Sequence, residues 1–172
     1  ERLPYKLHYY LLFIWEKKRL PCLMNPQDYS DFVFRDSFYG RHNKHAYLAD
    51  KYEVRQYVEG RGLGKTLTKL YGVWDDANII DFDKLPNGFA LKCNHIICTD
   101  KYKLDIDATR KQLNEWLKMK HPKFFEQHYN HIKPMIICEE LIQPNTDGSF
   151  PNDYKIHCAN GKPVFIQICF ER

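Results

Sequence analysis

The fold is decided by the stretch Leu85-Pro86-Asn87-Gly88-Phe89-Ala90-Leu91-Lys92-Cys93-Asn94-His95. Its Pro-Asn-Gly segment is a turn signal, and the apolar run Phe89 to Leu91 after it predicts a short buried strand. This strand ends at Lys92, a lone cation followed by polar side chains. Most lysines at strand ends simply reach the solvent, but the same arrangement is expected where a sheet meets an anionic ligand. Lys92 is therefore a candidate site residue that depends on support from the rest of the chain.

The composition predicts one folded protein with a substantial core, because 172 residues with 44% hydrophobic and 15% aromatic side chains are enough to bury one. The formal charge of +4 suits an anionic ligand such as a nucleotide or an acidic saccharide. It is far from the concentrated basic surface of a nucleic-acid-binding protein, so we expect no nucleic-acid partner. No run approaches the roughly 20 apolar residues of a membrane span.

The six cysteines lie mostly in apolar, strand-like runs, where a free cysteine behaves as a small hydrophobic residue. A chain of this size does not need disulfides, so we expect reduced thiols and a cytoplasmic location.

The apolar run Tyr9–Trp15 is short and flanked by charge, and it predicts a core helix. The polar, basic segment Gly40–His45 is interpreted as a solvated connector.

A helix is predicted from Asp50, a plausible N-cap, because Val54 and Val58 fall at helical spacing on one face. Lys51 and Arg55 are four residues apart and share another face, where like charges repel by a few tenths of a kcal/mol. An anionic ligand would relieve this repulsion, and so would Glu53 or a neighbouring carboxylate.

Further elements are predicted on both sides of the lysine strand. Leu70–Trp74 and residues 96–100 have the composition of short strands, and residues 105–120 have the cap and apolar stripe of a helix. The join after His95 has neither Gly nor Pro, which a tight hairpin would need. A loop is therefore expected to be missing from the sequence at this point.

Two acidic positions stand out in the last third of the chain. Residues 135–142 predict a buried strand that contains Glu139 and Glu140, and burying a free carboxylate is costly. At least one of the two should be exposed, paired or facing a ligand. Residues 153–168 predict a hairpin with a type I′ turn at Asn160-Gly161, in which Asp153 and Lys155 point to one face.

Four segments in this order resemble the TupA-like ATP-grasp family, which is associated with teichuronopeptide and other cell-surface or capsular polysaccharides. They are Ala49-Asp50-Lys51-Tyr52-Glu53-Val54-Arg55, Leu85-Pro86-x-x-Phe89-x-Leu91-Lys92-Cys93-Asn94-His95, Glu139-Glu140, and Asp153-Tyr154-Lys155 with Asn160-Gly161-Lys162. The resemblance covers about residues 46–172. It implies an α+β, ATP-grasp fold in which the nucleotide lies between a small α/β subdomain and a C-terminal antiparallel sheet that is incomplete in this chain.

The implied organisation has four parts. Residues 1–45 form a helical and loop region, residues 46–84 a helix and strand that precede the grasp, residues 85–138 the small subdomain, and residues 139–172 the hinge with the start of the C-terminal subdomain.

The resemblance also implies ATP-binding residues. Lys92 would hold the α- and β-phosphates, Arg55 would reach the phosphates, and Lys155 would face them. Asn94 and His95 would touch the γ-phosphate or the substrate. Arg55, Lys92 and His95 are the implied catalytic residues.

The adenosine part of ATP would be held by the later segments. Glu139, in the Glu139-Glu140 pair, would accept a hydrogen bond from the adenine amino group, and backbone near Leu141 and Ile142 would edge the base. Asp153 would bind the ribose hydroxyls.

The implied reaction is ligation with ATP and Mg²⁺. ATP phosphorylates a carboxylate, for which an acidic saccharide such as a uronic acid is expected, and an amino acid or other amine attacks the acyl phosphate to give an amide. Positioning and neutralisation of phosphate charge dominate such chemistry. Family members carry a glycine-rich loop after Asn-His, whereas Ile96 follows here, so either this protein has lost the loop or the sequence skips it, and we expect the second. The resemblance also implies that the region supplying the Mg²⁺ ligands would follow Arg172. No metal ligand is assigned.

Three other interpretations remain. A zinc module would use Cys93, His95, Cys98, His157 and Cys158 as ligands, but their spacing does not match common zinc modules. A non-catalytic saccharide- or nucleotide-binding module would bind without turnover, and a nucleic-acid binder would show steep salt dependence. An ATP-dependent phosphotransferase would make no amide and release no phosphate.

Overall fold

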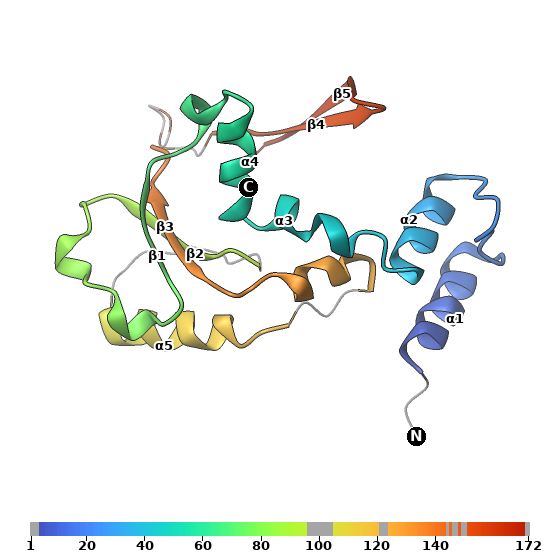
Figure 1. Cartoon of the computed structure of the whole chain (residues 1–172), viewed down its shortest axis with the longest axis horizontal. Helices are drawn as coiled ribbons and strands as arrows, with labels where there is room; N and C mark the ends of the chain where they lie inside the picture. Colours follow the sequence, from blue (N-terminus) through green and yellow to red (C-terminus); the bar gives the residue numbers. More distant parts are fainter. Residues whose placement is uncertain are drawn as a thin grey trace.

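The computed structural model describes residues 4–95, 105–120, 124–143, 145, 148 and 151–170. Helices surround a three-stranded antiparallel sheet, and a separate two-stranded sheet follows (Figure 1). The predicted α+β class is therefore confirmed. The strand predicted at 96–100 and the expected loop after His95 lie outside the described residues.

The three-stranded sheet contains β1 (Leu70–Trp74), β2 (Phe89–Cys93) and β3 (Ile136–Glu140) in the order β1-β3-β2. All neighbours are antiparallel, and on β2 Ala90 lies opposite Glu139 while Lys92 lies opposite Ile137. Directly opposed residues point to the same face of a sheet. Lys92 and Glu139 therefore share one face. The boundary predicted between the small subdomain and the hinge region, at residues 138 and 139, falls within β3.

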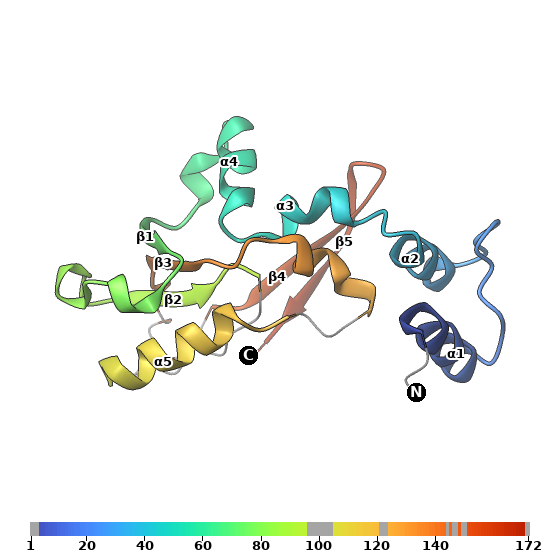
Figure 2. The ribbon, with the colours of Figure 1, turned by 60° about the horizontal axis from the view of Figure 1, so that its bottom comes forward.

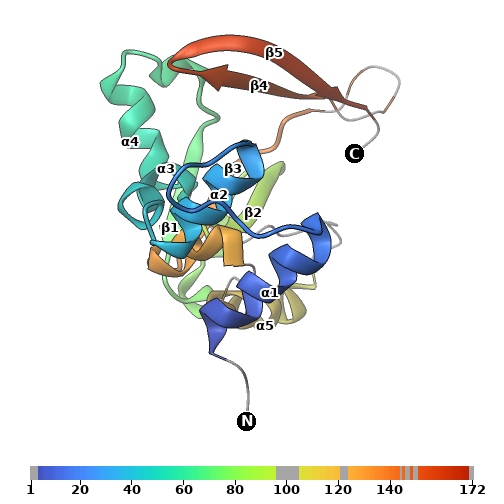
Figure 3. The same cartoon turned by 90° about the vertical axis from the view of Figure 1, so that its right-hand side faces the viewer.

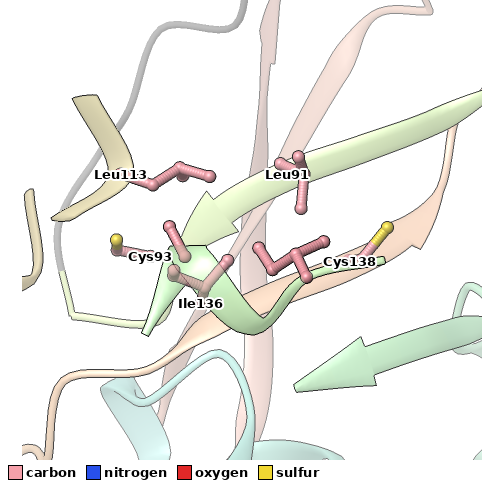
Figure 4. Packing of buried hydrophobic residues seen from close by; sticks show 7 residues of the cluster. Leu91, Cys93, Leu113, Ile136 and Cys138 are labelled. Atoms are coloured by element: carbon pink, nitrogen blue, oxygen red, sulfur yellow. The ribbon is translucent and has the colours of Figure 1, made fainter. Parts of the chain in front are cut away.

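The other face of the sheet carries the main core, which α5 (Ile106–Leu117) covers. Leu91 and Cys93 of β2 and Ile136 and Cys138 of β3 are buried there against Leu113 of α5 (Figure 4). Asp105 caps this helix, since its carboxylate accepts hydrogen bonds from the backbone N–H groups of residues 107 and 108. The helix and the cap are as predicted, although the helix ends three residues before the predicted limit of 120.

The face with Lys92 lies toward α3 (Ala46–Ala49) and α4 (Glu53–Gly60), on the opposite side of the sheet from α5 (Figure 2). Asp50 joins these helices and accepts hydrogen bonds from the N–H groups of Tyr52 and Glu53 at 2.7 and 3.2 Å. Asp50 therefore makes the capping hydrogen bonds expected of it, although α4 begins later than predicted, with Tyr52 at the N-cap position. Short 3₁₀ helices connect the other elements: η1 (Asn43–His45), η2 (Gly64–Thr66), η3 (Ala77–Ile79), η4 (Phe82–Lys84) and η5 (Phe124–His131).

The N-terminal helices α1 (Tyr5–Lys17) and α2 (Tyr29–Phe38) form a small cluster of their own, at the right of Figure 1 and toward the viewer in Figure 3. Its centre is Phe13 against Phe34, with ring centroids 4.9 Å apart. The predicted core helix around Tyr9–Trp15 exists and buries Phe13, but in this separate cluster and not under the sheet, and its Trp15 is 69% exposed. The apolar side of a short amphipathic helix packs against whichever element folding places beside it, and here that element is α2.

The second sheet is a hairpin of β4 (Asp153–Ala159) and β5 (Lys162–Cys169). Its turn residues Asn160 and Gly161 have φ values of 50° and 76°, as a type I′ turn requires, so the predicted hairpin is confirmed. Apolar side chains of both strands are exposed, among them Tyr154, Ile156, Phe165 and Ile166. Within the described ranges, no helix is long and apolar enough to cross a membrane.

Candidate nucleotide-binding site

The site is built on the face of the sheet that carries Lys92 and Glu139. The Lys92 ammonium forms an ion pair with Glu139 Oε2, and Arg55 Nη1 donates to Glu139 Oε1 at 2.7 Å. Residues from β2, β3 and α4 therefore meet at one carboxylate. Because the Glu139 side chain is only 8% exposed, the two cations offset the cost of burying its charge.

Arg55 is held from two sides. Its Nη1 binds Glu139, and its Nη2 donates to the carbonyl oxygen of Thr68 at 2.5 Å, in the segment that leads into β1. The prediction that Lys51 and Arg55 share a helical face is wrong, because α4 begins at Glu53 and Lys51 lies before it. The carboxylate that neutralises Arg55 comes from within the chain, on β3.

Lys92 differs from Arg55 in its access to solvent. Its side chain is 30% exposed, whereas that of Arg55 is 11% exposed. The ammonium can therefore contact both Glu139 and a ligand, and a point charge of this kind suits a phosphate group. Of the two cations at Glu139, Lys92 is the accessible one.

Asn94 follows β2 and is fully buried. Its side-chain nitrogen donates to Asp50 Oδ2 at 2.9 Å and to the Lys133 carbonyl at 3.0 Å, and its side-chain oxygen accepts from the Met135 N–H at 2.8 Å. Lys51 Nζ adds contacts to the backbone oxygens of Cys93 and Asn94 at 3.2 and 3.3 Å. The Asn94 amide thus joins β2, the cap of α4 and the start of β3. Its nucleotide contact stays a prediction.

His95 lies against the end of α5. Its Nε2 is 3.1 Å from the Met119 carbonyl, which can only accept, so Nε2 carries the proton. Nδ1 is buried and has no hydrogen-bond partner among the described residues. Burial lowers the pKa of His95 below its usual value, and the nearby Lys51 charge adds to this effect. The structure therefore places a neutral imidazole beside α5 and does not bring it to Glu139.

The residues predicted to edge the base follow directly after Glu140, the last residue of β3. Glu140 is exposed and pairs with Phe89 of β2, and its N–H donates to the Lys69 carbonyl, next to β1, at 2.8 Å. Leu141 is half-buried and Ile142 is 60% exposed. The prediction that one of the two acids would be paired or exposed is confirmed for both: Glu139 is paired and Glu140 is exposed.

Asp153 and Lys155 lie on β4, in the separate two-stranded sheet. Lys155 Nζ is 3.6 Å from Asp153 Oδ2, so the two side chains share a face as predicted. The structure brings together Arg55, Lys92 and Glu139, and it places the predicted ribose and phosphate contacts of Asp153 and Lys155 on another element (Figure 1). The contacts of Asp153 and Lys155 with the nucleotide stay predictions.

Sequence reasoning missed the residues that hold this site in place. Asp50 was recognised only as a cap, yet its second carboxylate oxygen binds Asn94. Thr68 gives no sequence signal, because it acts through its backbone carbonyl. The Ala49–Arg55 segment did indicate Asp50 and Lys51 as candidates. Nothing in the sequence indicated that they contact Asn94 at the end of β2.

The side chains at the candidate positions fit a nucleotide better than they fit a metal ion. Lys92 and Lys155 are partly exposed cations that suit phosphates, and Asp153 is an acceptor that suits hydroxyl groups. No group of three or more His, Cys, Asp or Glu side chains within the described ranges is arranged to hold a metal ion, so no residue is assigned to Mg²⁺. The five cysteines in those ranges form no disulfide with one another, and burial raises the pKa of Cys138 to about 12.

The α+β fold and the ion-paired lysine at a strand end agree with the ATP-grasp class of proteins, whose members are generally ATP-dependent carboxylate–amine ligases. A family model described as TupA-like ATPgrasp matches residues 33–172, so the chain belongs to the TupA-like ATP-grasp family. The resemblance predicted from the sequence is confirmed, and the match begins earlier than residue 46. No curated protein and no solved structure matched the chain.

Proposed function

We propose that this protein is an ATP-dependent carboxylate–amine ligase that binds ATP at the Lys92–Glu139 pair. The observation that carries the proposal is the meeting of Lys92, Glu139 and Arg55 at one buried carboxylate, in a chain of the TupA-like ATP-grasp family. Lys92 holds the α- and β-phosphates, and Glu139 accepts from the adenine amino group. The backbone at Leu141 and Ile142 edges the base.

Arg55 acts as a positioning residue in this proposal. A direct contact with phosphate would require its guanidinium to leave both Glu139 and Thr68, whereas its present contacts fix the Glu139 carboxylate. Asn94 likewise positions the end of β2 through Asp50 and Met135. His95 supports the same strand end from the α5 side.

Asp153 and Lys155 complete the site from the hairpin. We propose that Asp153 binds the ribose hydroxyls and that Lys155 faces the phosphates, because their shared face carries one acceptor and one cation. The nucleotide would then lie between the three-stranded sheet and the antiparallel hairpin. Mg²⁺ supplies further neutralisation of phosphate charge when it is bound.

The proposed reaction joins an amine to a carboxylate, in the cytoplasm, during surface-polysaccharide biosynthesis. The carboxylate oxygen of a uronic-acid saccharide attacks the γ-phosphorus, and ADP leaves. The nitrogen of an amino acid or other amine then attacks the acyl carbon, phosphate leaves, and an amide is formed. Holding the reactants together and neutralising charge supply the rate enhancement.

Nucleotide binding to Lys92→Ala tests the site. ATP affinity should be lost in this variant, while Glu139 keeps Arg55 as its partner and the fold persists by circular dichroism. Lys84→Ala is the matched control, because Lys84 is a surface lysine on η4 whose side chain is 84% exposed. Unchanged ATP affinity in folded Lys92→Ala would overturn the assignment.

Product analysis tests the reaction. Purified protein is incubated with ATP, Mg²⁺, a uronic-acid saccharide and an amino acid, and ADP, phosphate and amide are measured together. A ligase gives all three products in equal amounts. ADP without phosphate would indicate a phosphotransferase, and ATP binding without turnover a binding module.

A further inference from the structure

Helix α1 carries apolar side chains on two opposite sides. Phe13 is buried against Phe34 of α2, with the ring centroids 4.9 Å apart. Leu7, Leu11 and Trp15 recur every four residues and therefore form a stripe along one side of the helix. Leu11 and Trp15 are each two residues from Phe13, and two residues of an α-helix turn about 200°, so they lie on the far side. These three residues, the outer stripe of α1, thus face away from α2.

The outer stripe is exposed. Leu7, Leu11 and Trp15 are 43, 46 and 69% exposed, whereas the cluster around Phe13 is completed by other side chains, chiefly tyrosines. In Figure 1, α1 lies at the right-hand end of the molecule, with α2 as the helix beside it. Single exposed apolar residues are common, but an aligned set of them marks a surface that meets another apolar surface.

Lysines lie at both ends of the outer stripe. Lys6 is in the first turn of α1, Lys17 is its last residue and Lys18 follows, and all three are exposed. Lys18 Nζ lies 5.2 Å from the centre of the Trp15 ring. Glu16 is the one acidic residue in the sequence of α1, so the cations outnumber the anions around the stripe.

The next cation along the chain is used within the protein. Arg19 pairs with Asp28 and with the buried Asp31, at 2.7 Å each. These two carboxylates are therefore already neutralised by Arg19, and the lysines of α1 keep a positive potential beside the outer stripe.

An apolar stripe with lysines around it fits the surface of a bilayer that contains anionic lipids. Leucine and tryptophan side chains enter the boundary between headgroups and acyl chains, and lysine ammonium groups reach the lipid phosphates. With 13 residues, α1 is too short to cross a bilayer and would lie in its plane. A second copy of the chain fits less well, because two outer stripes packed on each other would bring the lysines of both copies together.

We propose that α1 docks this protein reversibly onto the surface of an anionic lipid bilayer. The outer stripe enters the interfacial layer, and Lys6, Lys17 and Lys18 pair with phosphate groups of the lipids. Because one short helix makes few contacts, the docking is reversible and weakens as salt screens the lysines. This inference goes beyond the proposed ligase function and does not depend on it.

Co-sedimentation of the full chain with lipid vesicles tests the docking. Vesicles of phosphatidylcholine with phosphatidylglycerol should bind the protein, and vesicles of phosphatidylcholine alone should bind it at least about ten-fold less. Leu11→Gln should weaken binding to the anionic vesicles about ten-fold, because an apolar side chain no longer enters the interfacial layer. Lys17→Gln should weaken it about five-fold, which is the effect of one charge near such a surface.

Two apolar residues elsewhere on the surface provide matched controls. Leu63, between α4 and η2, is 56% exposed, and Ile166, on the hairpin that also exposes apolar side chains, is 58% exposed. Leu63→Gln and Ile166→Gln should bind the anionic vesicles as the unsubstituted protein does. Lys84→Gln is the control for charge, because the Lys84 side chain is 84% exposed and lies on η4. Circular dichroism shows whether each variant is folded.

Lys17→Gln changes an exposed side chain, so it tests the docking even if Leu11→Gln fails to fold. Equal binding to both kinds of vesicle, binding to neither, or equal losses in Leu11→Gln and Ile166→Gln would overturn the proposal. Self-association without vesicles that Leu11→Gln abolishes would also overturn it, since the outer stripe would then be covered by a second copy of the chain.

Discussion

Arg55 Nη1 lies 2.7 Å from Glu139 Oε1, although the two residues are 84 positions apart in the chain. The acid also pairs with Lys92, so one carboxylate connects α4, β3 and β2. Breaking a buried ion pair on one side leaves an uncompensated charge, and this costs more than the pair contributes when intact. The site and the stability of the sheet therefore depend on the same side chain.

Replacement of Glu139 should weaken both stability and nucleotide binding. Glu139→Gln leaves Arg55 and Lys92 as like charges without their acid, and we expect a loss of about 3 kcal/mol in the free energy of unfolding. Urea unfolding measures it. Glu140→Gln is the control, because the Glu140 side chain is exposed. This substitution should change the free energy of unfolding by no more than about 0.5 kcal/mol. Equal effects of the two substitutions would contradict the role of the ion pair.

Replacement of Asn94 should be costly even without any ligand. Asn94→Ala leaves a carboxylate oxygen of Asp50 and the Met135 N–H without a buried partner, and we expect the free energy of unfolding to fall by about 3 kcal/mol. Asn78→Ala, on the exposed surface of η3, should have little effect. If the two variants unfold at the same urea concentration, the Asn94 amide does not stabilise the fold as described.

Two glycines should respond to alanine with opposite signs. A Cβ atom at Gly72 in β1 would overlap the indole of Trp74, so Gly72→Ala should lower stability by about 1–3 kcal/mol and change the tryptophan fluorescence. At Gly60, which ends α4, a Cβ atom meets nothing within 4 Å. Gly60→Ala should raise stability by about 0.5 kcal/mol, because alanine loses less backbone entropy than glycine. Thermal unfolding with both variants in parallel checks the signs.

Stability should fall on mild acidification because of His95. Burial lowers the pKa of His95 in the folded state, while the unfolded chain takes up a proton near pH 6.5. The stabilisation is therefore complete above about pH 6.5 and is lost as the pH falls toward the lowered pKa of the folded state.

His95→Gln tests this pH dependence. The free energy of unfolding is measured between about pH 7.5 and pH 5, and the variant should show a flatter profile than the unsubstituted protein. His157→Gln, on the exposed hairpin, should keep the original slope. A slope that is the same in all three proteins would exclude His95 as its source.

Thiol reactivity should follow burial. The Cys138 thiol, whose pKa burial raises to about 12, and the buried Cys93 should resist alkylation at neutral pH. The exposed Cys22 and Cys158 should react first. Mass spectrometry of peptides after brief alkylation identifies the modified positions, and early labelling of Cys138 would show that the core opens readily.

Elements that depend on local signals were predicted well. The Asn160-Gly161 turn fixes its own backbone angles, Asp105 caps α5 through groups two and three residues away, and Pro86 to Gly88 sets the start of β2. These signals act between neighbours in the chain, so the sequence displays them directly. The position of α1 beside α2 could not be read this way, because an apolar stripe does not specify its partner.

The candidate site was predicted as a set of residues but not as an arrangement. Lys92 and Glu139 were both identified, and a carboxylate partner for Arg55 was considered. The register that places Ala90 opposite Glu139, and hence Lys92 beside it, exists only after β2 and β3 have paired. The contacts of Asp50 with Asn94 and of His42 with His128 also join distant segments, and no spacing in the sequence marks them.

The sequence by itself determined the family, the α+β class and the chemical types at the candidate positions: a strand-end lysine, an acid in a buried strand and an acid–lysine couple on a hairpin. Only the tertiary structure decided that Glu139 binds Arg55 as well as Lys92, that the Asn94 amide is buried in a structural role, and that the hairpin forms a sheet of its own. The reason is physical: turns and caps are made between neighbouring residues, whereas ion pairs and buried amides are made between segments that folding brings together.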